Sequence, residues 1–134
     1  MTRPVVLLPE DLAERIVAHC LAELPNEGCG LFAIAGDGRV VAVYPTSNQS
    51  ASPASYTVPP EEHHAALVAA ESAGWRLGGV FHSHPYGSAE LSMVDLQAAI
   101  DPEWVYLVVG MRGEPEIRGW RVRNGEVEEV EMRG

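Results

Sequence analysis

Residues 77–85 read Leu-Gly-Gly-Val-Phe-His-Ser-His-Pro, an apolar run that ends in two histidines and a proline. The run has the length of a buried strand, and Pro85 halts it because proline lacks the N–H that a sheet ladder needs. Alternate residues of a strand point to the same face, with Cα atoms about 6.6 Å apart. His82 and His84 are therefore predicted to project together from the end of one strand.

Hydrophobic patterns on both sides of this strand predict an α/β fold that forms a single domain over residues 1–134. Helices are predicted over residues 9–23, 59–74 and 92–100. Further strands are predicted over residues 5–8, 30–35, 40–45, 104–110, 116–123 and 126–132. Glycine-containing turns join two pairs of these strands as hairpins. We expect a mixed, mostly antiparallel sheet flanked by helices, with the last strand at its edge.

The charge of the chain limits its partners. Its 134 residues contain 9 basic and 19 acidic side chains, which gives a net charge of −10. Nucleic acids and anionic membranes attract clustered Lys and Arg, so we expect neither as the main partner. The uncharged stretches are too short for a spanning helix and are broken by Gly or Pro, so no transmembrane segment is expected.

The cysteines and the N-terminus indicate a cytoplasmic location. Cys20 and Cys29 are the two cysteines, and their spacing is not that of a CxxC motif. This usage is typical of a reducing compartment. The first residues, 1–4, lack the apolar run and small-residue cleavage site of a secretory leader.

Asp95 is a candidate for a third ligand of a metal ion bound by the two histidines. Asp95 lies in the first turn of the predicted helix 92–100, and the intervening loop can return the chain to the end of the strand. Two imidazoles and one carboxylate provide three protein ligands, which leaves a fourth tetrahedral position for water. This donor set is typical of a catalytic zinc site, so we predict one Zn²⁺ held by His82, His84 and Asp95.

The Ser92-x-x-Asp95 spacing has a second, purely structural interpretation. It also matches a capping box, in which Ser92 is the N-cap of the helix. The two interpretations are compatible, because a cap fixes the helix start from which Asp95 is aimed. Cys29 is read as a buried residue rather than a nucleophile or a fourth ligand.

Three further residues are candidates for catalysis or substrate binding. Glu27, in the segment Asn26-Glu27-Gly28-Cys29-Gly30, is a candidate general base, and the nearby glycines permit close backbone approach. Asn48 lies in the Ser-rich loop 46–59, where it is read either as a substrate-binding residue or as a turn former. Tyr86, just after Pro85, is read either as a substrate-binding residue or as a solvated loop residue.

Glu27, His82-x-His84, Ser92 and Asp95 together match the motif of the JAMM (MPN+) metalloproteases without a gap. The chain resembles the small bacterial branch of this family, similar to hydrolases of sulfur-carrier proteins, over residues 5–123. The resemblance implies the MPN fold, with layering like that of cytidine deaminases. The chain lacks the insertions of the eukaryotic deubiquitinases, so the resemblance does not imply specificity for a ubiquitin-chain linkage.

For the site, the resemblance implies zinc on His82, His84 and Asp95, proton transfer by Glu27, and oxyanion stabilisation by Ser92. The implied activity is a metallopeptidase or isopeptidase reaction. Zinc-bound water, assisted by Glu27, attacks the amide bond after the C-terminal glycine of a ubiquitin-like or sulfur-carrier protein and releases cysteine or another amine.

Two other functions remain open at this point. Two histidines and an aspartate also form the facial triad of non-haem Fe(II) enzymes. A non-catalytic interaction domain that zinc merely stabilises would show the same ligands. A zinc deaminase is disfavoured because its Pro-Cys-x-x-Cys element is missing. The sequence does not identify the carrier protein, the leaving amine or the oligomeric state.

Overall fold

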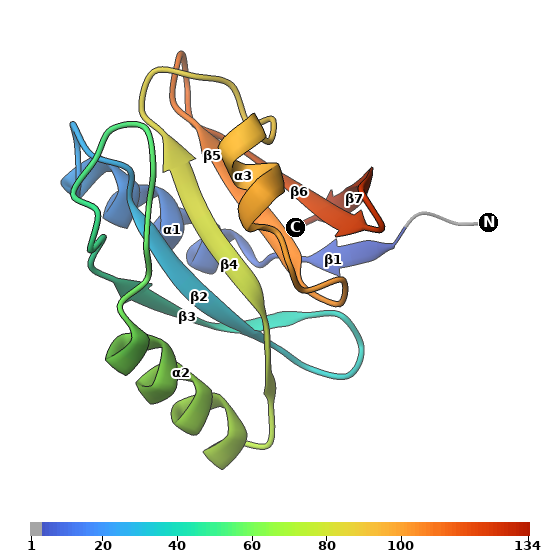
Figure 1. The fold of residues 1–134 in the computed structure, drawn as a ribbon. Helices are drawn as coiled ribbons and strands as arrows, with labels where there is room; N and C mark the ends of the chain where they lie inside the picture. Colours follow the sequence, from blue (N-terminus) through green and yellow to red (C-terminus); the bar gives the residue numbers. More distant parts are fainter. Residues whose placement is uncertain (1–3) are drawn as a thin grey trace.

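The computed structural model describes residues 4–134, within which seven strands form one sheet and three helices pack around it (Figure 1). The strands are β1 (Val5–Leu7), β2 (Cys29–Ile34), β3 (Val40–Thr46), β4 (Arg76–His84), β5 (Val105–Gly110), β6 (Glu116–Arg123) and β7 (Glu126–Arg133). The helices are α1 (Glu10–Ala22), α2 (Pro60–Ser72) and α3 (Met93–Ala98). Residues 1–3, which bear on the expected lack of a leader, lie outside the described part.

The sheet has the order β1-β7-β6-β5-β4-β2-β3. Two neighbouring pairs, β1 with β7 and β4 with β5, are parallel, and the remaining pairs are antiparallel. The predicted mixed, mostly antiparallel α/β sheet is thus confirmed. Strand β4, which carries the histidines, lies inside the sheet between β2 and β5.

The prediction that the last strand forms an edge is wrong. Strand β1 pairs in parallel with β7 and places Val5 opposite Glu131, while the N–H of Glu131 donates to the carbonyl of Pro4 at 2.8 Å. Burial of Val6, which is 2 % exposed, holds β1 in place. This contact joins the two ends of the chain, so local patterns around either strand do not show it.

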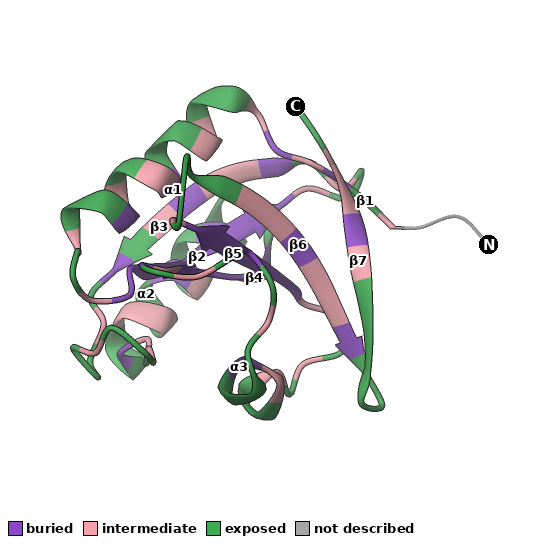
Figure 2. Ribbon diagram, turned by 90° about the horizontal axis from the view of Figure 1, so that it is seen from above, coloured by how far each residue is buried: buried purple, intermediate pink, exposed green. Residues whose placement is uncertain are grey.

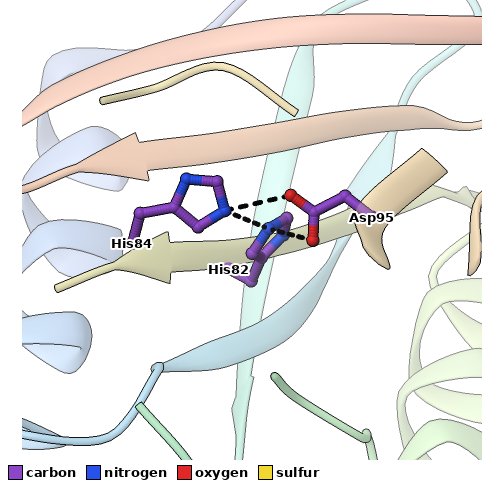
Figure 3. Close-up of side chains that lie close together, drawn as sticks. All are labelled: His82, His84 and Asp95. Carbon is purple, nitrogen blue, oxygen red and sulfur yellow. Dashed lines mark hydrogen bonds and ion pairs between the residues drawn. The ribbon is translucent and has the colours of Figure 1, made fainter. Parts of the chain in front are cut away.

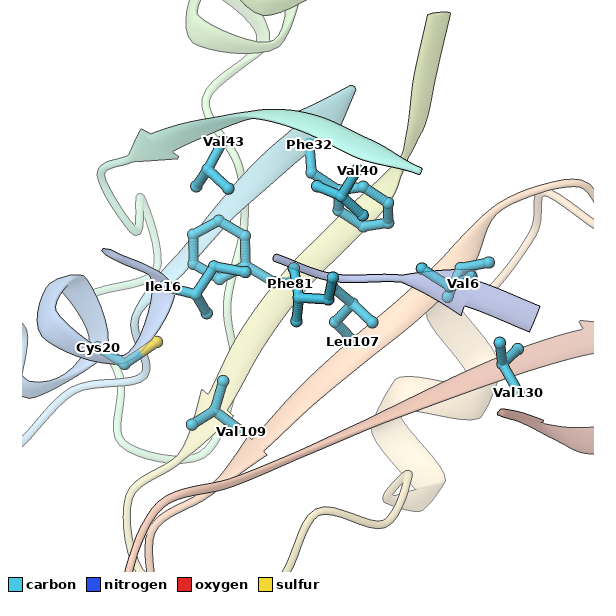
Figure 4. Packing of buried hydrophobic residues seen from close by; sticks show 12 residues of the cluster. Val6, Ile16, Cys20, Phe32, Val40, Val43, Phe81, Leu107, Val109 and Val130 are labelled. Atoms are coloured by element: carbon cyan, nitrogen blue, oxygen red, sulfur yellow. The ribbon is translucent and has the colours of Figure 1, made fainter. Parts of the chain in front are cut away.

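The central strands carry apolar cores on both faces. On one face, Ile16 and Cys20 of α1 pack with Phe32 and Phe81 (Figure 4). On the other, Ala66 and Ala70 of α2 belong to a cluster that includes Val80. Figure 2 shows the central strands buried along their length, while the helices are exposed on their outer sides. Two covered faces explain why these strands are continuously apolar rather than alternating.

Helix α3 is shorter than predicted. It ends at Ala98 rather than near Ile100, and the side chain of Ile100 is 87 % exposed. The chain then turns toward Asp101 and Pro102, and a residue before proline avoids the helical conformation. Among residues 4–134, no helix combines the length and apolar character needed to cross a membrane.

Gly79 allows β4 and β5 to approach each other. A Cβ at this position would lie 1.9 Å from the carbonyl oxygen of Val105, and its φ of 155° also disfavours side-chain-bearing residues. Any larger residue must therefore separate β4 from its parallel partner.

We expect Gly79→Ala to lower the free energy of unfolding by about 3 kcal/mol or more, because the methyl group collides with backbone that cannot move aside. The midpoint of urea unfolding measures this loss. Gly36→Ala is the control, since a Cβ at Gly36 meets nothing within 4 Å. Equal midpoints for the two variants would contradict the proposed close approach.

Candidate metal centre

The three predicted ligands converge on one point. Nε2 of His82 lies 3.1 Å from Oδ1 of Asp95, and Nε2 of His84 lies 3.0 Å from Oδ2 of the same carboxylate. The two imidazole Nε2 atoms are 3.3 Å apart. Figure 3 shows both rings directed from β4 toward the start of α3. Within residues 4–134, these side chains form the one group of three or more His, Cys, Asp or Glu residues that could hold a metal ion.

The surroundings of the histidines suit them as ligands. Nδ1 of His84 donates to the carbonyl of Ser88 at 2.8 Å, so its Nε2 faces Asp95 and is the nitrogen available to a metal. The ring of His82 is fully buried and stacks on Tyr56 with centroids 4.4 Å apart. Burial lowers the pKa of His82, which favours the neutral imidazole that a metal requires.

Asp95 supplies the negative charge. Although burial raises the pKa of this carboxyl, hydrogen bonds with His82 and His84 hold it well below its usual range. The carboxylate is 7 % exposed. Two imidazole nitrogens and one carboxylate oxygen therefore lie close enough to share a single divalent cation.

Ser92 and Asp95 also form the predicted helix cap, in addition to the contacts of Asp95 with the histidines. The N–H of Asp95 donates to Oγ of Ser92 at 3.1 Å, and the N–H of Ser92 donates to Oδ2 of Asp95 at 2.9 Å. This is a complete capping box. The cap orients the carboxylate whose two oxygens face the histidines, so one carboxylate serves both the helix start and the candidate metal site.

Glu27 lies beside this cluster. It is 3 % exposed, and its Oε1 has no hydrogen-bond partner among the described residues. Burial raises the pKa of Glu27 to about 7. Together with His84 and Ser92 it lines a hollow of about 240 Å³. A buried carboxylate with an unused oxygen at a small hollow is a group suited to exchanging protons with a water molecule.

Ser83, between the two histidines, is a residue that the sequence reasoning missed. Its Oγ accepts the N–H of Gly28 at 2.8 Å, and its own N–H donates to the carbonyl of Gly28 at 3.0 Å. These bonds fasten the segment that carries Glu27 to the strand that carries the ligands. Strand alternation could have indicated this role in the sequence, since it places Ser83 on the opposite face of the strand from both histidines.

The loop candidates occupy different environments. The amide of Asn48 donates to the carbonyls of Glu27 and Ser55, at 3.1 and 3.0 Å, so it fixes the loop against Glu27. Tyr86 is 71 % exposed at the rim of the hollow that Glu27 lines. Substrate binding by either residue stays a prediction.

Cys29 is buried, as expected, and lies outside the metal-binding group. Its thiol is 3.4 Å from Oγ1 of Thr46, and burial raises the pKa of this thiol to about 11. Cys20 and Cys29 are both free. Neither a nucleophilic thiolate nor a fourth ligand is therefore assigned to Cys29.

A family model of the prokaryotic homologs of the JAB domain matches residues 9–123. The chain belongs to this family. Desampylase from Haloferax volcanii is 35% identical over 126 residues, which cover 90% of this chain and 91% of the relative. CysO-cysteine peptidase from Mycobacterium bovis is 30% identical over 128 residues, with 93% and 88% covered. A probable TtuB-protein conjugate cleaving protease from Thermus thermophilus is 38% identical over 112 residues, with 81% and 72% covered.

Solved structures agree with this assignment. The solution structure of a Desulfitobacterium hafniense protein has a TM-score of 0.87 at 33% identity and covers 95% of this chain and 90% of its own. The structure of a JAMM metalloprotease-like zinc site in the proteasome and signalosome has a TM-score of 0.59 at 16% identity, with 98% and 99% covered, which supports the MPN fold alone. The predicted fold and family are confirmed, and the chain is a hydrolase of the JAMM type.

We expect Ser83→Ala to lower the free energy of unfolding by about 1–3 kcal/mol, because it leaves the buried N–H of Gly28 without an acceptor. Urea unfolding of the metal-free protein measures the change. Ser72→Ala, at the exposed end of α2, is the matched control and should lie within about 0.5 kcal/mol of the unsubstituted chain. A loss no larger than that of the control would count against the fastening role of Ser83.

Proposed function

We propose that this chain is a zinc-dependent peptidase or isopeptidase that hydrolyses the amide bond after the C-terminal glycine of a ubiquitin-like or sulfur-carrier protein. The observation that carries the proposal is the buried, unpartnered oxygen of Glu27 beside the His82–His84–Asp95 cluster. The names of the relatives support the substrate class, since they include a CysO-cysteine peptidase and a probable TtuB-protein conjugate cleaving protease.

The donor set fits zinc. Two imidazole nitrogens and one carboxylate oxygen are ligands that Zn²⁺ accepts, and three protein ligands are typical of catalytic sites. We propose one zinc ion per chain, held by His82, His84 and Asp95. Bound zinc supplies a Lewis acid that polarises a carbonyl and lowers the pKa of water toward about 7.

Glu27 is proposed to transfer the proton. A carboxyl with a pKa near 7 is populated in both protonation states at neutral pH. It can therefore take a proton from the attacking water and return it to the leaving amine. Its exclusion from bulk solvent keeps Oε1 free for this exchange, because no other described group uses it.

Ser92 is proposed to stabilise the oxyanion. Its Oγ already accepts the N–H of Asp95, which leaves its own O–H free to donate toward the hollow that it lines with Glu27. Donation to the oxygen that gains charge in the transition state lowers the barrier, and losing one such donor costs about 2.7–4 kcal/mol.

The proposed substrate reaches the site from the exposed rim. Asn48 and Tyr86 are proposed to bind this substrate. Tyr86 would contact the substrate directly, and Asn48 would act by ordering the loop that contacts the substrate. The net charge of −10 favours a carrier protein with a basic patch. A cytoplasmic location is part of the proposal, and the two free, buried thiols support it.

We expect the metal-stripped chain to take up one equivalent of zinc and His84→Ala to lose this binding, because that substitution removes one of three ligands. Metal analysis after dialysis measures the stoichiometry. His64→Ala, on the exposed side of α2, is the control and should retain one equivalent. A chain that refuses zinc but retains Fe(II) would favour the facial-triad alternative instead.

We expect Glu27→Gln to retain zinc and the fold but to lose turnover by at least about 100-fold, since the amide cannot accept the proton. Candidate ubiquitin-like and sulfur-carrier proteins extended beyond their terminal glycine serve as substrates, and mass spectrometry follows the released product with and without chelator. Normal turnover in zinc-loaded Glu27→Gln removes Glu27 from its role. Carriers that stay intact with the unsubstituted enzyme contradict the proposed function.

A further inference from the structure

The loop between β4 and α3 is fastened to the neighbouring strands by a tryptophan. The indole N–H of Trp120, on β6, donates to the carbonyl of Ala89 at 2.9 Å. Ala89 is fully buried, and a Cβ at Gly110 would lie 2.5 Å from its nitrogen. The loop therefore lies directly against the end of β5, close to the β5–β6 turn (Figure 1).

This attachment occurs one peptide group away from the carbonyl that contacts His84, a candidate metal ligand. The carbonyl of Ser88 accepts Nδ1–H of His84 at 2.8 Å, and the carbonyl of Ala89 accepts Trp120. The two peptide planes that meet at Ala89 are thus each held by one hydrogen bond. Because peptide groups are planar, fixing both planes fixes the φ and ψ of Ala89 and the direction of the Ser88 carbonyl.

The indole ring of Trp120 is in turn held by the neighbouring side chain of Arg118. The guanidinium of Arg118 lies 4.7 Å from the centroid of the Trp120 ring. The same guanidinium makes two hydrogen bonds with Glu129 of β7, at 2.8 and 3.0 Å, and lies 3.7 Å from Glu90 of the loop. A planar cation held by a paired carboxylate keeps the ring in one orientation.

We propose that Trp120 is a positioning residue for the metal centre. Acting through Ala89 and Ser88, it holds the carbonyl that accepts Nδ1–H of His84, which fixes the imidazole ring with its Nε2 toward the candidate metal position. Hydrogen bonds to the second nitrogen of a ligating histidine fix its tautomer, and losing such a partner costs about 10–100-fold in metal affinity. This inference rests on the proposed metal site but not on the proposed substrate.

Trp120→Phe tests the inference, because it keeps an aromatic ring beneath Arg118 and removes the indole donor. Two measurements are made on the full chain. NMR of the zinc-loaded protein reports how fast the Nδ1–H proton of His84 exchanges with solvent, and competition with a chromophoric chelator reports the affinity for Zn²⁺. In Trp120→Phe we expect faster exchange of this proton than in the unsubstituted chain and about 10-fold weaker zinc binding.

Trp75→Phe is the matched control, since no described residue accepts its indole N–H and it lies in the other core. Arg118→Ala, at a partly exposed position, is the second variant and replaces Trp120→Phe if that variant fails to fold. It should weaken zinc binding in the same direction but by less. Exchange rates of the His84 Nδ1–H proton and zinc affinities within twofold of the Trp75→Phe values would overturn the inference. Failure of the proposed zinc site is distinguishable, since the unsubstituted chain would then not bind zinc.

Discussion

Pairing of β4 with β2 is the interaction on which the site depends. Its register places His82 opposite Cys29, and the two hydrogen bonds between Ser83 and Gly28 extend the pairing to the residue just before β2. The residues joined in this way are 55 positions apart in the sequence. Because Glu27 directly precedes Gly28, the same pairing that builds the sheet also delivers a carboxylate to the histidines.

The site concentrates groups that a folded protein ordinarily keeps in water. Glu27 and Asp95 are both buried carboxyls, and burial of a carboxylate without a partner is costly. Asp95 is compensated by two imidazoles and by the cap of α3, whereas one oxygen of Glu27 is left without a partner. A divalent cation between them would offset this accumulation of negative charge. A metal ion bound there would therefore stabilise the folded state.

Local patterns predicted most of the elements. The apolar spacing of Leu12, Ile16 and Cys20 predicted a helix over residues 9–23, and α1 spans Glu10–Ala22. Proline and glycine marked the ends of most other elements well, because these residues limit backbone hydrogen bonding and φ. The role of β7 was mispredicted because its neighbour β1 lies at the other end of the chain and is only three residues long.

For the site, the sequence by itself determined which residues are the candidate metal ligands. His82, His84 and Asp95 were predicted as a ligand set because strand alternation and a helix cap are short-range rules that spacing reveals. The tertiary structure decided what surrounds these ligands: Ser83 holding Gly28, Asn48 holding the carbonyl of Glu27, and Trp120 holding the loop behind His84. These contacts join strands and loops that are distant in the chain. Their partners are selected by sheet register and packing, which only the complete fold defines.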